Sequence, residues 1–240
     1  ISRGDFLESL KMLIANPVSI TQGVDPLCGI ACAIKIAAEL DPVGLVRMSA
    51  NFFANGKYVS RSFLDKPIKV PNSLKNVEVS DGLTPANFVL QTTVKSFYNP
   101  ITGYNNKPGT KYNEWQGITF PYQLKRFLKS YFSITQIPAR TFLHTIEEIQ
   151  EILSQPTLLM AWTSWNQMKN PEGSFKLLKQ HYVIIKKVER VGEEVHLVID
   201  NPRKSHSQHQ KFKFKNERQF YKAIIGIYPF RRKEISSAIK

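Results

Sequence analysis

With 240 residues, of which 42% are hydrophobic and 11% aromatic, the chain is large and apolar enough for a substantial core, and we predict one domain. Its 33 lysines and arginines outnumber 19 acidic residues, and the net charge of +14 favours an anionic partner such as nucleic acid, a membrane or wall surface, or an acidic protein. Two cysteines argue against a disulfide framework and a structural zinc site, and the sequence has no run of about 18 apolar residues that could span a membrane.

Helical patterns dominate the first part of the chain. Apolar residues recur at helical spacing and each pattern stops at proline or glycine, which predicts helices over residues 5–15, 28–40 and 41–55. Residues 57–82 contain several prolines and lysines with little periodicity, and we expect a loop with one edge strand there.

Two more helices are expected in the middle of the chain. Thr84 is a cap and Pro85 a first-turn proline for a helix that runs through Phe97. A second helix is expected over residues 120–132, with its basic side chains on a solvated face: Lys125, Arg126 and Lys129. Residues 99–117 between them are rich in turn-forming and aromatic residues, which is typical of a surface loop.

After residue 140 the pattern changes from helix to sheet. Thr145 and Glu148 have the spacing of a capping box, for a helix that ends near Ser154. Residues 166–173 are expected to be a polar loop, and the β-rich stretches predict strands over residues 157–162, 181–185, 195–200, 211–214 and 223–228. Helices followed by a mainly antiparallel sheet predict the α+β class.

Cys28 is expected in the first turn of its helix, after a loop that Pro26 closes. A thiol in that position lies at the positive end of the helix dipole beside unpaired N–H groups, which favours the thiolate. Gly29 lets a substrate carbonyl approach the backbone, and the N–H of Cys28 can donate to an oxyanion. Gln22, six positions earlier, is a candidate for the second donor.

A cysteine within an apolar helix is more often a small core residue than a nucleophile. Cys32, one turn after Cys28 and flanked by alanines, is expected to be buried and inert. We expect no disulfide between the two, because neighbouring turns of one helix direct their side chains poorly for a bridge. A catalytic role for Cys28 therefore depends on partners elsewhere in the chain.

His181 is the best candidate for such a partner. It begins an expected strand, and Asp200 and Asn201 end the next strand before Pro202, so a hairpin brings a carboxylate or an amide near the imidazole. Considered alone, His181 is more simply a surface histidine, and Asp-Asn-Pro a turn signal. The other histidines are weaker candidates, because they lie within a strand, in polar segments or before a helix cap: His196, His206, His209 and His144.

Three segments together resemble the papain-like cysteine hydrolases, most closely their bacteriocin-leader-peptidase-like branch: Gln22-x5-Cys28-Gly29, His181-Tyr182-Val183-Ile184 and Ile199-Asp200-Asn201-Pro202. The resemblance implies that Cys28 is the nucleophile, His181 the general base and acid, Asp200 its orienter and Gln22 the oxyanion donor. It implies a single papain-like domain over 1–240, without metal or cofactor.

The resemblance covers roughly residues 18–40 and 156–202. Ile30 stands where the family usually has proline. Residues 41–140 correspond to nothing in a minimal peptidase, and we expect a helical insert there. Asp200 and Asn201 are consecutive and point to opposite sides of an extended chain, so only one of them is expected to orient His181, and we choose Asp200.

The helix-rich middle and the Gln-Gly-x-x-Pro-Leu-Cys-Gly phrase also look similar to papain-like toxin domains at the ends of bacterial delivery proteins. That resemblance implies an effector that is secreted or delivered into a competing cell, and an acidic immunity protein as partner. The absence of a signal-peptide pattern, the start at Ile1 and the cytosolic cysteine usage fit a processed or excised domain.

The chemistry expected of such a site is acyl transfer on a protein or peptide, with an acidic protein or a cell-wall peptide suiting the charge. Peptidase, amidase, deamidase and transglutaminase activity share the scheme, and the sequence does not choose among them. The alternative is a non-catalytic basic module that binds nucleic acid or another polyanion. Its support is a set of aromatic and basic residues in one loop: Tyr104, Lys107, Lys111, Tyr112 and Trp115. Against it, the basic residues are scattered and no nucleic-acid motif is present.

Overall fold

The computed structural model describes residues 1–23, 27–59, 67–72, 79, 82–98, 119–132, 140–141, 144–176, 180–203 and 209–231. These residues fall into two compact units. Unit 1 comprises the described residues up to 132 together with Pro202 and Arg203, and unit 2 comprises the other described residues from 140 onward. The prediction of one papain-like domain with an insert at 41–140 is not tested by this division and stays a prediction.

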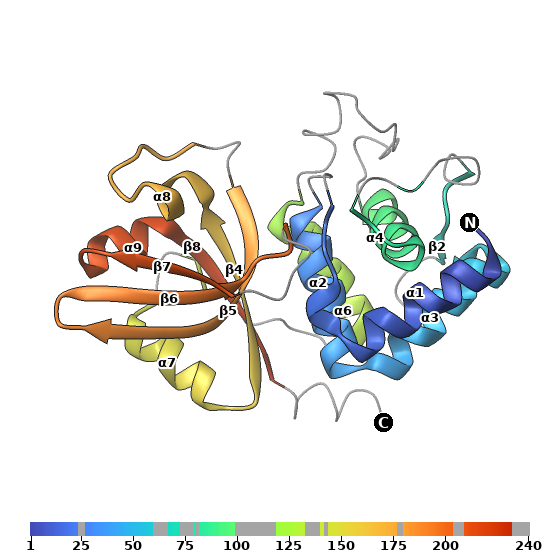
Figure 1. The fold of residues 1–240 in the computed structure, drawn as a ribbon, viewed down its shortest axis with the longest axis horizontal. Helices are drawn as coiled ribbons and strands as arrows, with labels where there is room; N and C mark the ends of the chain where they lie inside the picture. The colour runs from blue at the N-terminus through green and yellow to red at the C-terminus, as the bar shows by residue number, and fades with distance from the viewer. Residues whose placement is uncertain are drawn as a thin grey trace. The chain divides into compact units, whose positions relative to one another are not determined.

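Unit 1 contains helices that match the predicted ones closely (Figure 1): α1 (Arg3–Ala15), α2 (Cys28–Leu40), α3 (Pro42–Asn55), α4 (Pro85–Tyr98) and α6 (Pro121–Phe132). The short 3-10 helix η1 (Pro17–Ser19) was not predicted. The ends of α3 show which capping interactions set the bounds that the sequence predicted. The Asp41 side chain accepts a hydrogen bond from the Gly44 N–H at 2.9 Å, and Gly56 closes the helix in the left-handed conformation.

Helix α2 is the centre of unit 1. Every residue from Gly29 to Ala38 is buried, Lys35 included. The neighbouring helices α1, α3, α4 and α6 all contact it. A helix with so long a run of buried residues requires other elements around it, and α2 meets that condition.

The 57–82 stretch contains more sheet than the one edge strand we predicted. Strands β1 (Lys57–Tyr58) and β2 (Ile68–Lys69) pair with each other as an antiparallel ribbon. The ribbon packs on α3 and α4, where Tyr58 and Ile68 are buried. With two residues in each strand, neither is long enough to produce an alternating pattern in the sequence.

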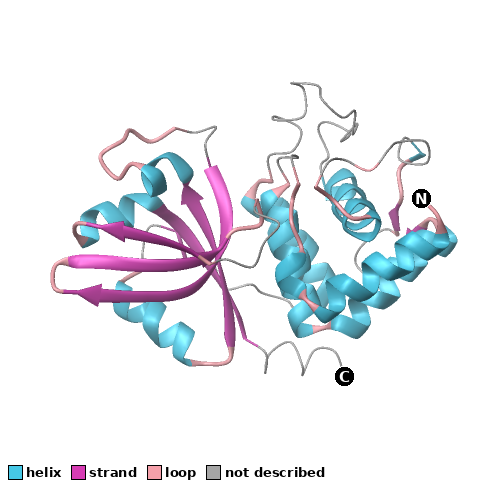
Figure 2. Cartoon of the chain, viewed as in Figure 1, coloured by secondary structure: helices cyan, strands magenta, loops and turns pink. Residues whose placement is uncertain are grey.

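Unit 2 contains an antiparallel sheet, whose strands are magenta in Figure 2. The strand order is β3-β8-β4-β5-β6-β7. Its strands are β3 (Arg140–Thr141), β4 (Thr157–Ser164), β5 (Gln180–Val191), β6 (Glu194–Asp200), β7 (Gln210–Phe214) and β8 (Ile224–Arg231). The helices of unit 1 precede this sheet along the chain, as the α+β prediction requires. Gly192 lies in the turn between β5 and β6 with φ of 62°, a backbone conformation that glycine adopts without strain.

Helix α7 (Ile146–Ser154) is confirmed with its capping box, but two short helices of unit 2 were not predicted. Helix α8 (Trp165–Lys169) lies within the expected polar loop, and α9 (Glu217–Ala223) precedes β8, so that the last strand begins at Ile224 rather than Ala223. At five and seven residues, both are too short for a hydrophobic period to be evident.

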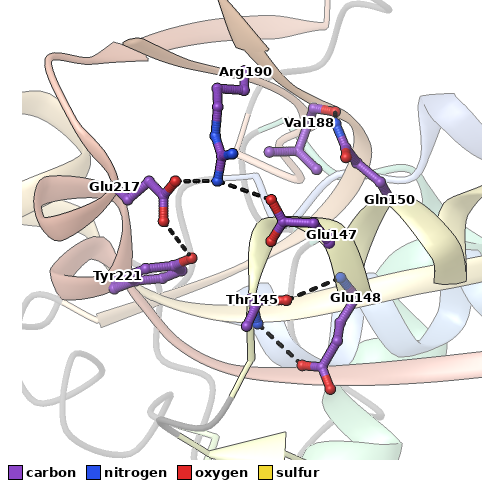
Figure 3. A network of polar contacts seen from close by, with 8 residues as sticks. All are labelled: Thr145, Glu147, Glu148, Gln150, Val188, Arg190, Glu217 and Tyr221. Carbon is purple, nitrogen blue, oxygen red and sulfur yellow. Dashed lines mark hydrogen bonds and ion pairs between the residues drawn. The ribbon is translucent and has the colours of Figure 1, made fainter. Parts of the chain in front are cut away.

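An ionic network joins α7 and α9 to the sheet (Figure 3). Arg190 of β5 binds Glu147 of α7 at 2.8 Å and also pairs with Glu217 of α9, which accepts a hydrogen bond from the Tyr221 hydroxyl at 3.0 Å. Gln150 donates to the Val188 carbonyl at 3.2 Å. The charged groups are partly exposed, so the apolar core beneath them contributes more to stability than the ion pairs do.

His144 is expected to make the free energy of unfolding of unit 2 depend on pH. This histidine is buried, and burial lowers its pKa from 6.5, an effect that the Glu148 charge only partly offsets. The unfolded chain therefore takes up a proton before the folded chain does as the pH falls below 6.5.

We expect His144→Phe to become more stable relative to the wild type as the pH falls from about 7 to about 5. Chemical denaturation at several pH values, followed by circular dichroism, measures the difference. A difference in unfolding free energy that is constant over this range would contradict the assignment of a neutral buried imidazole.

Candidate functional site

The predicted position of Cys28 is confirmed: it is the first residue of α2. Its N-cap, Leu27, makes no side-chain capping hydrogen bond. Cys28 is partly exposed, whereas Cys32 is completely buried. Neither cysteine is in a disulfide, as predicted. Of the two thiols, Cys28 is thus the one that a reagent can reach.

The loop that carries Gln22 is fixed by hydrogen bonds within unit 1. The Pro202 carbonyl accepts from the Gln22 N–H at 2.7 Å and from the Thr21 hydroxyl at 2.8 Å. Two amides of α4 bind the Thr21 carbonyl, Asn87 at 2.7 Å and Gln91 at 2.6 Å. Gln22 is buried in this setting, and residues 24–26, Pro26 among them, lie outside the described part of the chain.

Asn87, Gln91 and Pro202 support this loop and were not among the predicted site residues. A signal was present for the first two, because they are amides four residues apart on a helix whose other buried side chains are largely apolar. Residues at that spacing share one helix face, so a pair of amides there indicates a polar target that both can bind. No comparable signal pointed to the Pro202 carbonyl.

In unit 2, His181 lies near the start of β5 and is buried. Its Nε2 is 2.7 Å from the side-chain oxygen of Asn201, the first residue after β6. The Asn201 amide nitrogen donates to the Gln210 side-chain oxygen at 2.7 Å, which sets the orientation of the amide and turns its oxygen toward the ring. An amide oxygen only accepts, so Nε2 carries a proton and acid–base exchange falls to Nδ1.

This geometry favours Asn201 over the Asp200 that we predicted as the orienter. Asp200 is the last residue of β6, stands opposite Ile184 in the strand ladder and is buried. Its role as orienter stays a prediction, whereas the amide of Asn201 is at hydrogen-bond distance from the ring. Asp200 has a carboxyl group and Asn201 an uncharged amide, so the identity of the orienter affects how strongly a protonated His181 is stabilised.

Further contacts hold the ring and the backbone of His181 in unit 2. The ring of Trp165, at the start of α8, lies 4.7 Å from the His181 ring between centroids. Lys169, one turn later, places its ammonium 5.3 Å from the centre of the Trp165 ring. The Thr163 hydroxyl donates to the His181 carbonyl at 2.9 Å. The ring is therefore held by an aromatic neighbour and the backbone by a hydroxyl.

The predicted site residues thus divide between the two units. Cys28 and Gln22 belong to unit 1, and His181, Asp200 and Asn201 to unit 2. Within unit 2 the structure brings His181 and Asn201 together. Of the weaker histidine candidates, His196 pairs with Glu194 at 2.8 Å, and His206 lies outside the described residues.

The remaining sequence features have the following positions. Arg126 and Lys129 of α6 are exposed and Lys125 is half-buried, which largely agrees with the predicted solvated face. The aromatic and basic loop proposed for nucleic-acid binding, 99–117, lies outside the described residues.

In the described part of the chain, no group of three or more histidine, cysteine or acidic side chains could hold a metal ion. The helices described there are all too short or too polar to cross a membrane.

Comparison of the sequence with known proteins found no match. No protein-family model matches the chain, and no curated protein matches it.

The orientation of the imidazole is testable without a substrate. We expect the wild type to show the Nε2–H tautomer of His181, because Asn201 accepts its proton, and we expect Asn201→Ala to lose this preference. Long-range ¹H–¹⁵N NMR correlations of the ring nitrogens measure the tautomer.

The matched control is Asp200→Asn, which keeps the size of the neighbouring side chain and removes its charge. Its His181 tautomer should remain that of the wild type. If Asp200→Asn changes the tautomer and Asn201→Ala does not, then the carboxylate is the orienter and the assignment above is wrong.

Proposed function

We propose that this protein is a papain-like cysteine hydrolase in which Cys28 is the nucleophile and His181 the general base and acid. The observation that carries the proposal is the 2.7 Å contact between His181 Nε2 and the Asn201 side-chain oxygen. A buried imidazole with one nitrogen committed to an orienting amide is suited to proton transfer at the other. The second support is the position of Cys28 as the first residue of an otherwise buried helix.

The proposed reaction is acyl transfer. The Cys28 thiolate attacks a substrate carbonyl carbon, and the oxyanion receives hydrogen bonds from the Cys28 N–H and the Gln22 side chain. The His181 imidazolium gives its Nδ1 proton to the leaving amine as the carbon–nitrogen bond breaks. A water molecule then gives a proton to His181 Nδ1 and attacks the thioester carbonyl carbon, and cleavage of the carbon–sulfur bond releases the acid and restores the Cys28 thiolate and the His181 imidazolium.

Asn201 fits the role of orienter in this scheme, and Asp200 is the alternative. An uncharged amide fixes the ring without adding a negative charge beside it, so the imidazolium is stabilised less than a carboxylate would stabilise it. Pro202, which follows Asn201 directly in the chain, binds the Gln22 loop through its carbonyl. The residue after the orienter therefore also supports the loop of the proposed oxyanion donor.

The proposed biological role is that of a toxin domain delivered into a competing bacterium, with a protein or peptide as substrate. The net charge of +14 suits an acidic protein or a wall peptide as target, and an acidic immunity protein as inhibitor. Hydrolysis, deamidation and transglutamination differ only in the leaving group and the final nucleophile, and the site is compatible with all three.

Growth inhibition tests the proposal. Expression of the wild-type chain inside an unprotected bacterium should inhibit growth, and Cys28→Ala should lower that inhibition by orders of magnitude, because the scheme has no other nucleophile. Cys32→Ala is the matched control, since it removes a thiol that is completely buried one turn away. Circular dichroism of the purified variants confirms that each is folded.

A Cys28→Ala variant that still inhibits growth fully would exclude the hydrolase proposal. The basic binding module would then be the leading account, and it predicts tight binding to a random oligonucleotide that weakens steeply as salt increases.

A further inference from the structure

Unit 2 has a groove of about 690 Å³ that is lined by α8, α9 and the loop that follows α8. The two helices contact each other and are labelled in Figure 1. Five side chains line this α8–α9 groove: Gln167, Phe175, Arg218, Tyr221 and Lys222. None of these five is a residue to which the proposed reaction assigns a step.

Two cations lie on one face of α9 at the groove. Arg218 and Lys222 are four residues apart, which places them on the same side of the helix, and both are exposed. Like charges at this spacing repel each other and destabilise a helix. In the part of the chain that the structure describes, neither cation forms an ion pair, and Glu217, which precedes Arg218, pairs with Arg190 instead. The two charges are therefore available to an anionic ligand.

A buried amide also lines the groove. Only 6% of the surface of Gln167 is exposed, and its side chain makes no hydrogen bond to any residue. Buried polar groups are normally hydrogen-bonded, so an amide in this position indicates that a ligand supplies the bonds. A side-chain amide offers both donors and an acceptor, which is the complement of a peptide group.

Two aromatic side chains give the groove its apolar surface. Phe175 is 50% exposed, which is unusual for so large an apolar side chain. The position of the Tyr221 ring is fixed, because its hydroxyl donates to Glu217 at 3.0 Å. Aromatic rings that are exposed beside polar groups are typical of binding surfaces, where they contact the apolar part of a ligand.

Hydrogen bonds hold the loop after α8 in place. The Asn166 amide donates to the Ser174 carbonyl at 2.7 Å, next to Phe175. The Gln219 amide of α9 donates to Glu172 at 2.6 Å, which joins the loop to the second helix. A groove whose walls are ordered before a ligand arrives loses less conformational entropy on binding.

We propose that the α8–α9 groove binds an acidic peptide segment. Its carboxylates bind Arg218 and Lys222, and its backbone binds the Gln167 amide. An apolar side chain of the segment packs against Phe175 and Tyr221. As a subsite for a protein substrate the groove rests on the proposed function, whereas the binding of the peptide does not.

Nucleic acid is the other polyanion that two cations and an aromatic ring could attract. A single strand is usually bound along a basic track with successive stacking platforms. Here the two cations lie within one turn of α9. The phosphodiester backbone presents acceptors only, so it leaves the acceptor of Gln167 unused, whereas a peptide group uses both functions of the amide.

The test is the binding of a fluorescein-labelled hexapeptide of alternating glutamate and phenylalanine, measured by fluorescence anisotropy in about 0.15 M salt. The full chain carries Cys28→Ala so that the peptide is not cleaved. We expect Arg218→Gln combined with Lys222→Gln to raise the dissociation constant by about tenfold or more, because the carboxylates lose charge-assisted hydrogen bonds. A peptide with glutamine in place of glutamate should bind more weakly, and the two substitutions should not affect it.

The matched charge control is Lys211→Gln combined with Lys213→Gln. These two lysines are exposed on β7 of the same unit, and their replacement lowers the net charge by the same amount. The dissociation constant should change by less than about threefold, because exposed charges away from the ligand are screened.

A second pair of variants tests the apolar contact. Phe175→Ala should weaken binding, whereas Val191→Ala, at an equal exposed fraction of 50%, should not. Circular dichroism checks that all variants are folded.

Equal losses of affinity in the two charge variants would overturn the proposal, because net charge alone would then attract the peptide. A labelled random oligonucleotide that binds more tightly than the peptide, and that loses its affinity when Arg218 and Lys222 are replaced, would also overturn it and assign the groove to nucleic acid.

The outcomes separate this inference from the proposed function. If Cys28→Ala still inhibits growth while peptide binding depends on Arg218 and Lys222, the groove binds acidic peptides and the hydrolase proposal fails. If Cys28→Ala abolishes inhibition and peptide binding is independent of the two cations, the hydrolase proposal stands and the groove is not its peptide site.

Discussion

The burial of α2 is the constraint on which unit 1 depends. All its residues from Gly29 to Ala38 are buried, so it requires neighbours around its whole circumference, and α1, α3, α4 and α6 contact it. The two ends of the helix are less covered, since Cys28 at its start and Glu39 and Leu40 at its end are partly exposed. The packing of α2 thus leaves a thiol accessible at the N-terminus of a buried helix.

In unit 2, the main constraint is on the orientation of the His181 imidazole. Strands β5 and β6 pair so that His181 near the start of one and Asn201 just beyond the end of the other meet at 2.7 Å. Gln210 fixes the amide and Trp165 packs against the ring. Rigid elements therefore set the position of the ring and of its hydrogen-bond partner, as proton transfer in a fixed geometry requires.

The sequence predicted the elements that have a clear period or a clear stop, such as α2 between Cys28 and Leu40. It did not predict α8 or α9, although Asn216 is an N-cap of α9 whose side chain accepts a hydrogen bond from the Gln219 N–H. The sequence did not predict which of Asp200 and Asn201 contacts His181. Asn201 lies one residue past the strand, where alternation no longer sets side-chain direction.

Cross-linking with 1,3-dibromoacetone tests the central claim, that Cys28 and His181 act on one substrate. Its two electrophilic carbons alkylate a thiol and then a nearby imidazole, so it joins only side chains that can approach within the length of three carbon atoms. We expect mass spectrometry to find one cross-linked peptide pair, between Cys28 and His181, which is lost in His181→Ala. Cys28 alkylated without a cross-link to His181, in protein shown to be folded, would contradict the account.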